Sequence, residues 1–242
     1  MKTNSFKTGI KDGLPICFGY LAVSFSFGIF AIQSGLSILE ATLMSLTNLT
    51  SAGQFAAVPI IAGGGLLMEL ALAQLVINLR YALMSLTLSQ KLDRQVKLRD
   101  RFLIAFGNTD EIFAVSVSKS HPVSKWYMFG LILTPLLGWT SGTLIGALIG
   151  NVLPVEIVLS LQVAIYGMFI AIVVPPAKED SAILLCVIIA LVLSCGFYYI
   201  PFLSTISSGF KIIICAVVAS VIMAIVKPLK TDNKEDENDS QT

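Results

Sequence analysis

Long apolar runs alternate with short polar interruptions along almost the whole chain. A helix that crosses a bilayer needs about 20 consecutive, mostly apolar residues. Six runs meet this requirement with few charges, and they cover residues 14–33, 66–88, 126–148, 156–174, 182–200 and 209–226. The pattern predicts an all-α, polytopic membrane protein with six full transmembrane helices.

Two further apolar segments each carry a polar break near their middle. Segment 38–62 is interrupted at residues 47–54, and segment 102–118 is interrupted at residues 107–111. A broken helix at membrane depth survives only where protein or a water-filled cavity satisfies its free backbone groups. Each segment is therefore a re-entrant or broken pair of short helices, or else a strongly tilted crossing.

The basic residues favour the re-entrant alternative. If 38–62 crosses fully and the N-terminus is inside, the basic loop 91–101 faces outside, against the positive-inside rule. An outside N-terminus places that loop inside, but it places Lys2, Lys7 and Lys11 outside. If both broken segments return to their own side, fourteen of the 16 basic residues share one side: Lys2, Lys7, Lys11, Lys91, Arg94, Lys97, Arg99, Arg101, Lys119, Lys125, Lys178, Lys227, Lys230 and Lys234. We therefore predict two re-entrant segments and two cytoplasmic termini.

The composition agrees with a membrane protein. The chain has 242 residues, of which 55% are hydrophobic and only 13% are charged. A soluble globule cannot bury that surplus, and a net charge of +1 gives no electrostatic footprint for a nucleic acid. We expect residues 1–230 to form a single transmembrane transporter domain in the lipid bilayer. The polar, acidic residues 231–242 are expected to form a disordered cytoplasmic tail.

The first break has the pattern of a helix start. Residues 51–54 read S-x-x-Q, which matches a capping box ahead of an apolar run. A half-helix over 52–62 would then begin at membrane depth, where its free N–H groups and its dipole attract a carboxylate. The alternative is that Asn48, Ser51 and Gln54 only hold helices together by hydrogen bonds.

The second break places two acids at a helix start. Thr109 is expected to cap a half-helix that begins at Asp110 and Glu111. The alternative places these acids in a first helical turn at the cytoplasmic interface, without a further role. Trp126, Tyr127 and Trp139 are expected in an aromatic belt at the membrane interface.

Arg80 lies within an apolar run, about 12 Å from its inner end. An arginine at the centre of a span costs about 2.5–3.5 kcal/mol on insertion scales. Its side chain is expected either to snorkel to the headgroups, to pair with Asp110 or Glu111, or to bind a substrate carboxylate. Gln74 and Asn78 precede it on one helix face and extend a polar stripe into the protein.

Catalytic signatures are missing from the sequence. There is no H-E-x-x-H, G-x-S-x-G or Walker A motif, and the single histidine, His121, lies in a basic loop. The four cysteines form no C-x-x-C pair. We therefore expect no enzymatic activity, no metal and no cofactor. Gly142, Gly146 and Gly150 are spaced for close helix packing.

Four segments resemble the AzlC family of branched-chain amino acid exporters: residues 9–15 (GIKDGLP), 51–55 (SAGQF), 78–81 (NLRY) and 109–114 (TDEIFA). The resemblance covers essentially the whole chain. It implies export of branched-chain amino acids across a bacterial cell membrane and a small hydrophobic partner subunit resembling AzlD. Tyr81 stands where a histidine is often expected, and Asn108 stands where an apolar residue is often expected, which puts the proton-coupling mechanism in doubt.

These observations give one mechanistic hypothesis. The start of the half-helix after the first break holds the substrate carboxylate, through Asn48, Ser51, Gly53, Gln54, Asn78 and Arg80. Asp110 or Glu111 holds the ammonium or carries the coupling proton. Phe55, Phe106 and Phe113 line the pocket for the substrate side chain. The alternatives are a passive channel for small solutes and a non-transporting membrane scaffold.

Overall fold

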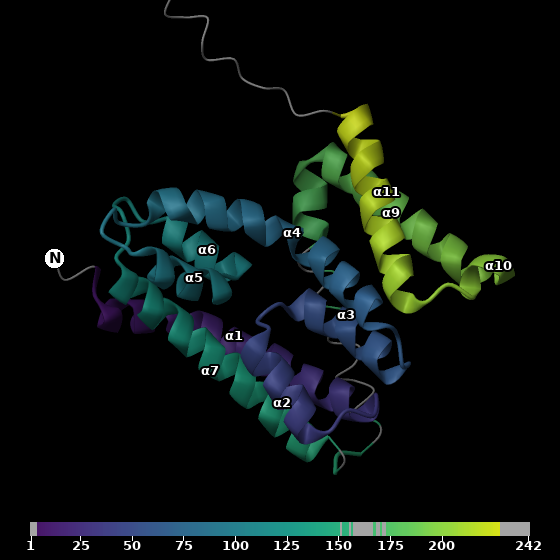
Figure 1. Ribbon diagram of the computed structural model, residues 1–242, viewed down its shortest axis with the longest axis horizontal. Helices are drawn as coiled ribbons and strands as arrows, with labels where there is room; N and C mark the ends of the chain where they lie inside the picture. The colour runs from purple at the N-terminus through teal and green to yellow at the C-terminus, as the bar shows by residue number, and fades with distance from the viewer. Residues whose placement is uncertain are drawn as a thin grey trace, which may run out of the picture.

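The computed structural model describes residues 4–150, 152–154, 156, 167, 170 and 173–227, and most of these residues lie in helices (Figure 1). The helices are α1 Phe6–Gln33, α2 Ile38–Thr47, α3 Ser51–Ala62, α4 Leu67–Lys91, α5 Leu98–Phe106, α6 Asp110–Val117, α7 Lys125–Ile149, α9 Ser181–Tyr199, α10 Pro201–Ser204 and α11 Ser208–Val226. In the described part, α1, α4, α7, α9 and α11 are long and apolar enough to cross a membrane. The all-α membrane fold is thus confirmed. Most of the predicted span 156–174 and the whole predicted tail 231–242 lie outside the described residues.

Helices α1 and α7 run parallel, side by side over their whole length, because small residues let their backbones approach closely (Figure 1). A Cβ atom on Gly146 would lie 2.0 Å from the carbonyl oxygen of Phe25, and one on Gly28 would lie 2.2 Å from the carbonyl oxygen of Thr143. A Cβ on Gly142 would lie 2.1 Å from Ser24 Oγ. The glycine seam predicted on α7 is confirmed at Gly142 and Gly146.

Helices α2 and α3 form a re-entrant pair. They contain 10 and 12 residues, so each is about 15–18 Å long and too short to span a bilayer. Val58 of α3 packs in one cluster with Leu36, which lies just before α2, and with Ala41 in the first turns of α2. The chain therefore descends through α2, turns at the break, and returns through α3 to the end where α2 began.

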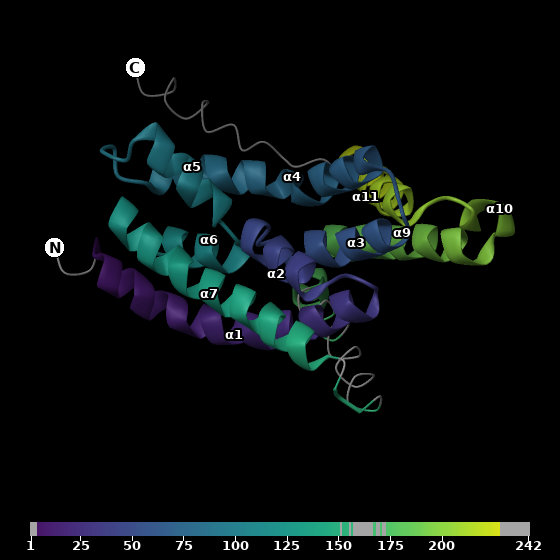
Figure 2. The same cartoon turned by 60° about the horizontal axis from the view of Figure 1, so that its bottom comes forward.

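Helices α5 and α6 form a second re-entrant pair. The Asp93 N–H donates to the Val123 carbonyl at 2.9 Å, and the Val123 N–H donates to the Lys91 carbonyl at 3.0 Å. The chain thus leaves α4 and returns to the same place before α7 begins. A tilted full crossing would separate Lys91 from Val123 by the thickness of the bilayer. The two pairs lie toward opposite ends of α1 and α7 (Figure 2).

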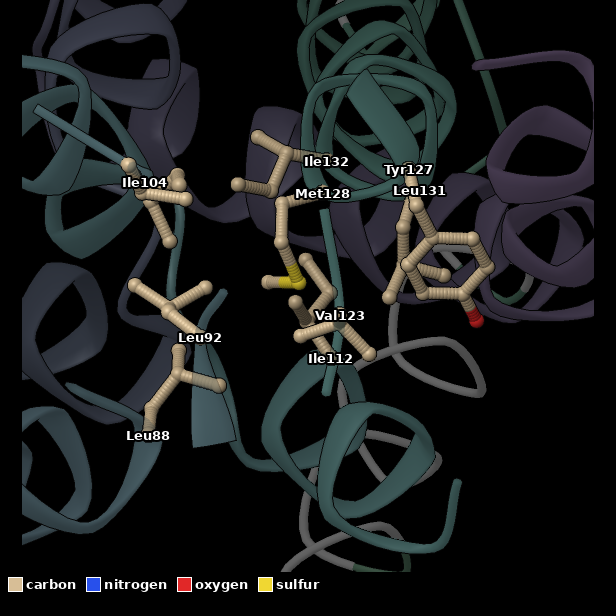
Figure 3. Close-up of a cluster of buried hydrophobic side chains, with 10 residues drawn as sticks. Leu88, Leu92, Ile104, Ile112, Val123, Tyr127, Met128, Leu131 and Ile132 are labelled. Carbon is tan, nitrogen blue, oxygen red and sulfur yellow. The ribbon is translucent and has the colours of Figure 1, made fainter. Parts of the chain in front are cut away.

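A cluster of apolar side chains holds the second pair in place. Ile104 of α5 and Ile112 of α6 are 1% and 0% exposed, and they pack with Leu88 of α4 and Met128 of α7 (Figure 3). In a bilayer, whose lipid tails are as apolar as these side chains, such contacts stabilise the pair by close van der Waals packing. The α5–α6 pair is therefore anchored mainly by its apolar faces.

Basic residues from three segments gather at one end of α1 and α7, which we call the basic end. Lys119 Nζ lies 2.7 Å from Asp12 Oδ2, and Lys125 Nζ lies 3.2 Å from Asp100 Oδ2. The Ser124 N–H donates to Asn4 Oδ1 at 2.8 Å, which fixes the start of α7 on the start of α1. This gathering agrees with the charge pattern on which the re-entrant prediction rested.

Helix α11 attaches to α4 at the opposite end. Glu69 of α4 is only 4% exposed, and its carboxylate accepts a 2.8 Å hydrogen bond from the Gly209 N–H in the first turn of α11. An acid at this place satisfies a free backbone donor and the positive end of the helix dipole. Glu69 therefore acts as a cap for a helix distant in sequence.

Candidate functional site

A cavity of about 640 Å³ lies near the middle of α1, α4 and α7, where both breaks meet. Its volume falls in the range of small-molecule sites. Its lining comes from α1, the two breaks, α4 and α7: Pro15, Ile16, Gly19, Tyr20, Val23, Leu49, Ser51, Ala52, Ile77, Arg80, Tyr81, Thr109, Asp110, Glu111 and Trp139. Four of the residues predicted for the site therefore share one cavity: Ser51, Arg80, Asp110 and Glu111.

The start of α3 faces this cavity without a side-chain cap. The N-cap residue is Thr50, and its hydroxyl donates to Asn48 Oδ1 at 2.9 Å instead of bonding the first turn of the helix. The capping-box interpretation of residues 51–54 is therefore wrong, and the helix begins at Ser51. The expected helix start with free N–H groups is still present, because no side chain caps the first turn of α3.

Gln54 holds the first break together. The side chain is completely buried, and its Nε2 donates to the Asn48 and Met44 carbonyls at 2.6 and 3.0 Å. Its Oε1 accepts a 2.9 Å hydrogen bond from Trp139 Nε1. Both ends of the amide thus bond protein groups. Gln54 therefore fits the alternative in which these polar residues hold helices together by hydrogen bonds.

The Gln54–Trp139 bond gives a stability prediction. Trp139→Phe leaves the buried Gln54 Oε1 without its donor, and we expect it to lower the free energy of unfolding by about 1–3 kcal/mol. Trp126→Phe is the matched control, because Trp126 is 59% exposed. Thermal unfolding in detergent measures both variants. Equal melting temperatures for the two variants would contradict the assigned bond.

The start of α3 is also fixed against the middle of α4. Gln74 Nε2 donates to the Gly53 carbonyl at 2.8 Å, and Asn78 Nδ2 donates to Gln74 Oε1 at 3.1 Å. A Cβ on Gly53 would lie 2.2 Å from Thr50 Oγ1 and 2.6 Å from Gln74 Oε1, so a larger residue there would displace both side chains. The buried Asn78 Oδ1 has no protein partner. Gly53 and Asn78 thus shape the break behind the cavity wall.

Arg80 pairs with the second break. Its Nη1 lies 2.7 Å from Asp110 Oδ2, and its guanidinium stacks over the Tyr81 ring at 4.9 Å from the centroid. Of the three possibilities for Arg80, the structure contains the pair with Asp110. Thr109 caps α6 as predicted, since its side chain accepts from the Ile112 N–H.

Glu111 has a different partner, which the sequence reasoning missed. Its Oε2 accepts a 2.5 Å hydrogen bond from the hydroxyl of Tyr20 on α1. The Tyr20 ring packs edge to face on Trp139, with 5.2 Å between the ring centroids. A tyrosine in the middle of an apolar run was the available signal for this residue.

Some aromatic predictions need correction. Trp139 and Tyr127 are 2% and 1% exposed, so neither belongs to an interfacial belt, and the Tyr127 hydroxyl donates to Asp12 at 2.8 Å. The expected phenylalanines do not line this cavity: Phe55 packs on Phe27 and Phe30 instead. Phe106 is 52% exposed, and Phe113 packs on the cluster of Figure 3. The apolar lining comes from aliphatic residues, from Pro15 and from Trp139.

Metal-binding side chains occur among the described residues. No set of three or more His, Cys, Asp and Glu side chains is placed there to hold a metal ion. The four cysteines are free thiols.

Comparison with known proteins identifies related chains. A family model described as AzlC protein matches residues 15–153, a range that contains every residue lining the cavity. An uncharacterized membrane protein of Archaeoglobus fulgidus is 33% identical over 179 residues, which cover 73% of this chain and 78% of that protein. Inner membrane protein YgaZ of Escherichia coli is 32% identical, over 61% of this chain and 62% of its own length.

A relative whose name states a substrate also matches. The branched-chain amino acid transport protein AzlC of Bacillus subtilis is 26% identical over 150 residues, which cover 61% of this chain and 58% of that protein. The chain thus matches less than two thirds of the length of this relative and of YgaZ. No solved structure matches the chain significantly.

Proposed function

The chain belongs to the AzlC family, and from this premise we propose that it is a secondary-active transporter that exports branched-chain amino acids. One observation supports the proposal most directly. The uncapped start of α3 and the two acids at the start of α6 line the same cavity at the middle of the spanning helices. The carboxylate of an amino acid zwitterion suits the start of α3, and its ammonium suits the two acids of α6.

The substrate carboxylate is assigned to the start of α3. Free N–H groups and the helix dipole at Ser51 and Ala52 favour an anion, and the Arg80 guanidinium lines the same space. Asn48, Gly53, Gln54 and Asn78 take the role of holding this helix start in position.

The substrate ammonium and side chain are assigned to other residues of the lining. Asp110 or Glu111 receives the ammonium, because both carboxylates line the cavity. Ile16, Val23 and Leu49 offer aliphatic surface to a branched side chain. We therefore expect apolar amino acids to be preferred over acidic ones, whose second carboxylate would be repelled by Asp110 and Glu111 in the same cavity.

Export is proposed to run on the proton gradient. The sequence contains no nucleotide-binding motif, and the carboxylates of α6 can take up protons. We further propose a small hydrophobic AzlD-like partner subunit and cytoplasmic termini, which follow from the family and from the positive-inside rule.

Transport by proteoliposomes tests the proposal. Vesicles that hold the protein, with and without the partner subunit, are given labelled leucine, isoleucine, valine, glutamate and lysine under an imposed proton gradient. We expect the three branched-chain substrates to accumulate against their gradients and a protonophore to abolish this accumulation. Downhill movement alone would indicate a passive channel. No movement in either preparation would indicate a scaffold.

A further inference from the structure

The two carboxylates of the cavity have unlike surroundings. Asp110 faces a full positive charge, since Arg80 Nη1 lies 2.7 Å away. Glu111 is exposed, lines the cavity, and accepts from the neutral Tyr20 hydroxyl. The charged and titratable groups of the lining are Tyr20 from α1, Arg80 and Tyr81 from α4, and Asp110 and Glu111 from α6, while Trp139 from α7 carries no titratable group.

We propose that Glu111 carries the coupling proton and that Tyr20 is the residue that positions it for this task. The inference rests on the proposed function, because it divides the roles of the two acids within that transport cycle. Asp110 then serves as the fixed counter-charge of Arg80.

Charge balance distinguishes the two acids. A proton on Asp110 would leave the Arg80 guanidinium without its counter-charge at membrane depth, where an unpaired charge is unfavourable. A proton on Glu111 leaves no unpaired charge, because its partner Tyr20 is neutral. Glu111 is therefore the acid that gains and loses a proton at the lower cost.

The proton transfer at Glu111 also explains coupling. The carboxylate takes a proton from a hydronium ion, so that one O–H bond forms on Glu111 and one O–H bond of the hydronium breaks to leave water. The reverse transfer returns the proton to water when the site opens to the other side. The anionic carboxylate binds the substrate ammonium, and the protonated acid does not. Proton and substrate thus compete for one group, which is the requirement for proton–substrate exchange.

Tyr20 links this acid to the first break. Gln54 accepts from Trp139, the Trp139 ring packs edge to face on Tyr20, and the Tyr20 hydroxyl donates to Glu111. The chain of contacts runs from α3 through α7 and α1 to α6. A displacement of the α3 start by substrate is therefore passed to the acid that binds the proton.

The variant Tyr20→Phe tests the inference, because it removes the hydroxyl and keeps the ring. Uphill leucine export is measured in proteoliposomes from pH 5 to pH 9. A hydrogen bond from a neutral donor favours the charged carboxylate, so we expect its loss to move the midpoint of the pH profile upward by about one pH unit. Tyr198→Phe is the matched control, because Tyr198 is 78% exposed on α9 and outside this cavity.

Two further variants keep the test decisive if Tyr20→Phe accumulates poorly. Glu111→Asp shortens the acid and breaks the contact with Tyr20, so its pH profile should shift as well. Glu111→Gln can neither carry the proton nor hold the substrate ammonium, so it should lose leucine–leucine exchange and uphill export together.

The outcomes separate this inference from the proposed function. An inactive wild-type protein with its partner would contradict the proposed function itself. An active wild type with unmoved pH midpoints in Tyr20→Phe and Glu111→Asp would overturn the role of Tyr20. Proton-driven uphill export by Glu111→Gln would overturn the role of Glu111.

Discussion

Replacing Arg80 by glutamine is expected to reduce leucine export about tenfold or more and to lower the amount of protein in the membrane. The Arg80 guanidinium pairs with Asp110 at 2.7 Å and lines the cavity beside the start of α3. Its loss leaves a carboxylate without a counter-charge, at a depth where insertion scales assign about 2.5–3.5 kcal/mol to one charge. The side chains of the pair are each 47% exposed, so water in the cavity reduces this cost.

A double variant separates the structural role of Arg80 from its role toward substrate. Asp110→Asn alone should also lower the protein level, because it leaves the guanidinium unpaired. Arg80→Gln combined with Asp110→Asn removes both charges, so the protein level should return toward that of the wild type while leucine export stays low. Arg94→Gln is the control, since Arg94 is exposed in the loop after α4.

The measurements are the membrane protein level on a blot and leucine export normalised to that level. Full export by the double variant would contradict the assignment of the substrate carboxylate to Arg80 and the α3 start. A double variant with a lower protein level than either single variant would contradict the ion pair as the cause of the single-variant losses.

The sequence located both breaks because polar residues at membrane depth are conspicuous in an apolar chain. The Arg80–Asp110 pair could be predicted for the same reason: two opposite charges at similar depth have few other partners. The re-entrant course of both segments followed from where the basic residues must lie. These features are set by the cost of placing polar and charged groups in the bilayer. That cost can be judged from hydropathy and charge along the sequence.

The partners of Gln54 and Tyr20 could not be predicted, because they come from helices distant in the sequence. Trp139 lies 85 residues after Gln54, and Glu111 lies 91 residues after Tyr20. An aromatic residue in an apolar run has the same local pattern at an interface and in a protein interior, which is why Trp139 was assigned to a belt. The S-x-x-Q pattern matched a capping box by chance, whereas the capping box of the structure joins Ser37 and Glu40.

Gly146→Ala is expected to have the largest effect on stability of any single methyl group added to the α1–α7 pair. The new Cβ would lie 2.0 Å from the Phe25 carbonyl oxygen, a backbone atom that cannot turn away as a side chain can. Overpacking costs about 1–3 kcal/mol where side chains adjust, so we expect about 3 kcal/mol or more here. For a chain of this size, the melting temperature should fall by roughly 6–12 °C.

Gly196→Ala provides a matched control, since Gly196 lies in α9 and a Cβ there would meet nothing within 4 Å. That variant should keep or slightly raise the melting temperature, because alanine favours a helix over glycine by up to about 1 kcal/mol. Thermal unfolding in detergent compares the two. An equal melting temperature for both variants would contradict the close backbone contact between α1 and α7.

The same substitution also probes transport, because α1 brings Tyr20 to the cavity and α7 brings Trp139. Moving α1 away from α7 would separate the Tyr20 ring from Trp139 and withdraw its hydroxyl from Glu111, whose hydrogen bond is only 2.5 Å long. Folded Gly146→Ala protein should therefore share the upward shift of the pH midpoint expected for Tyr20→Phe. A destabilised variant with an unchanged pH midpoint would show that the glycine seam holds the helices together without setting the geometry of the acid.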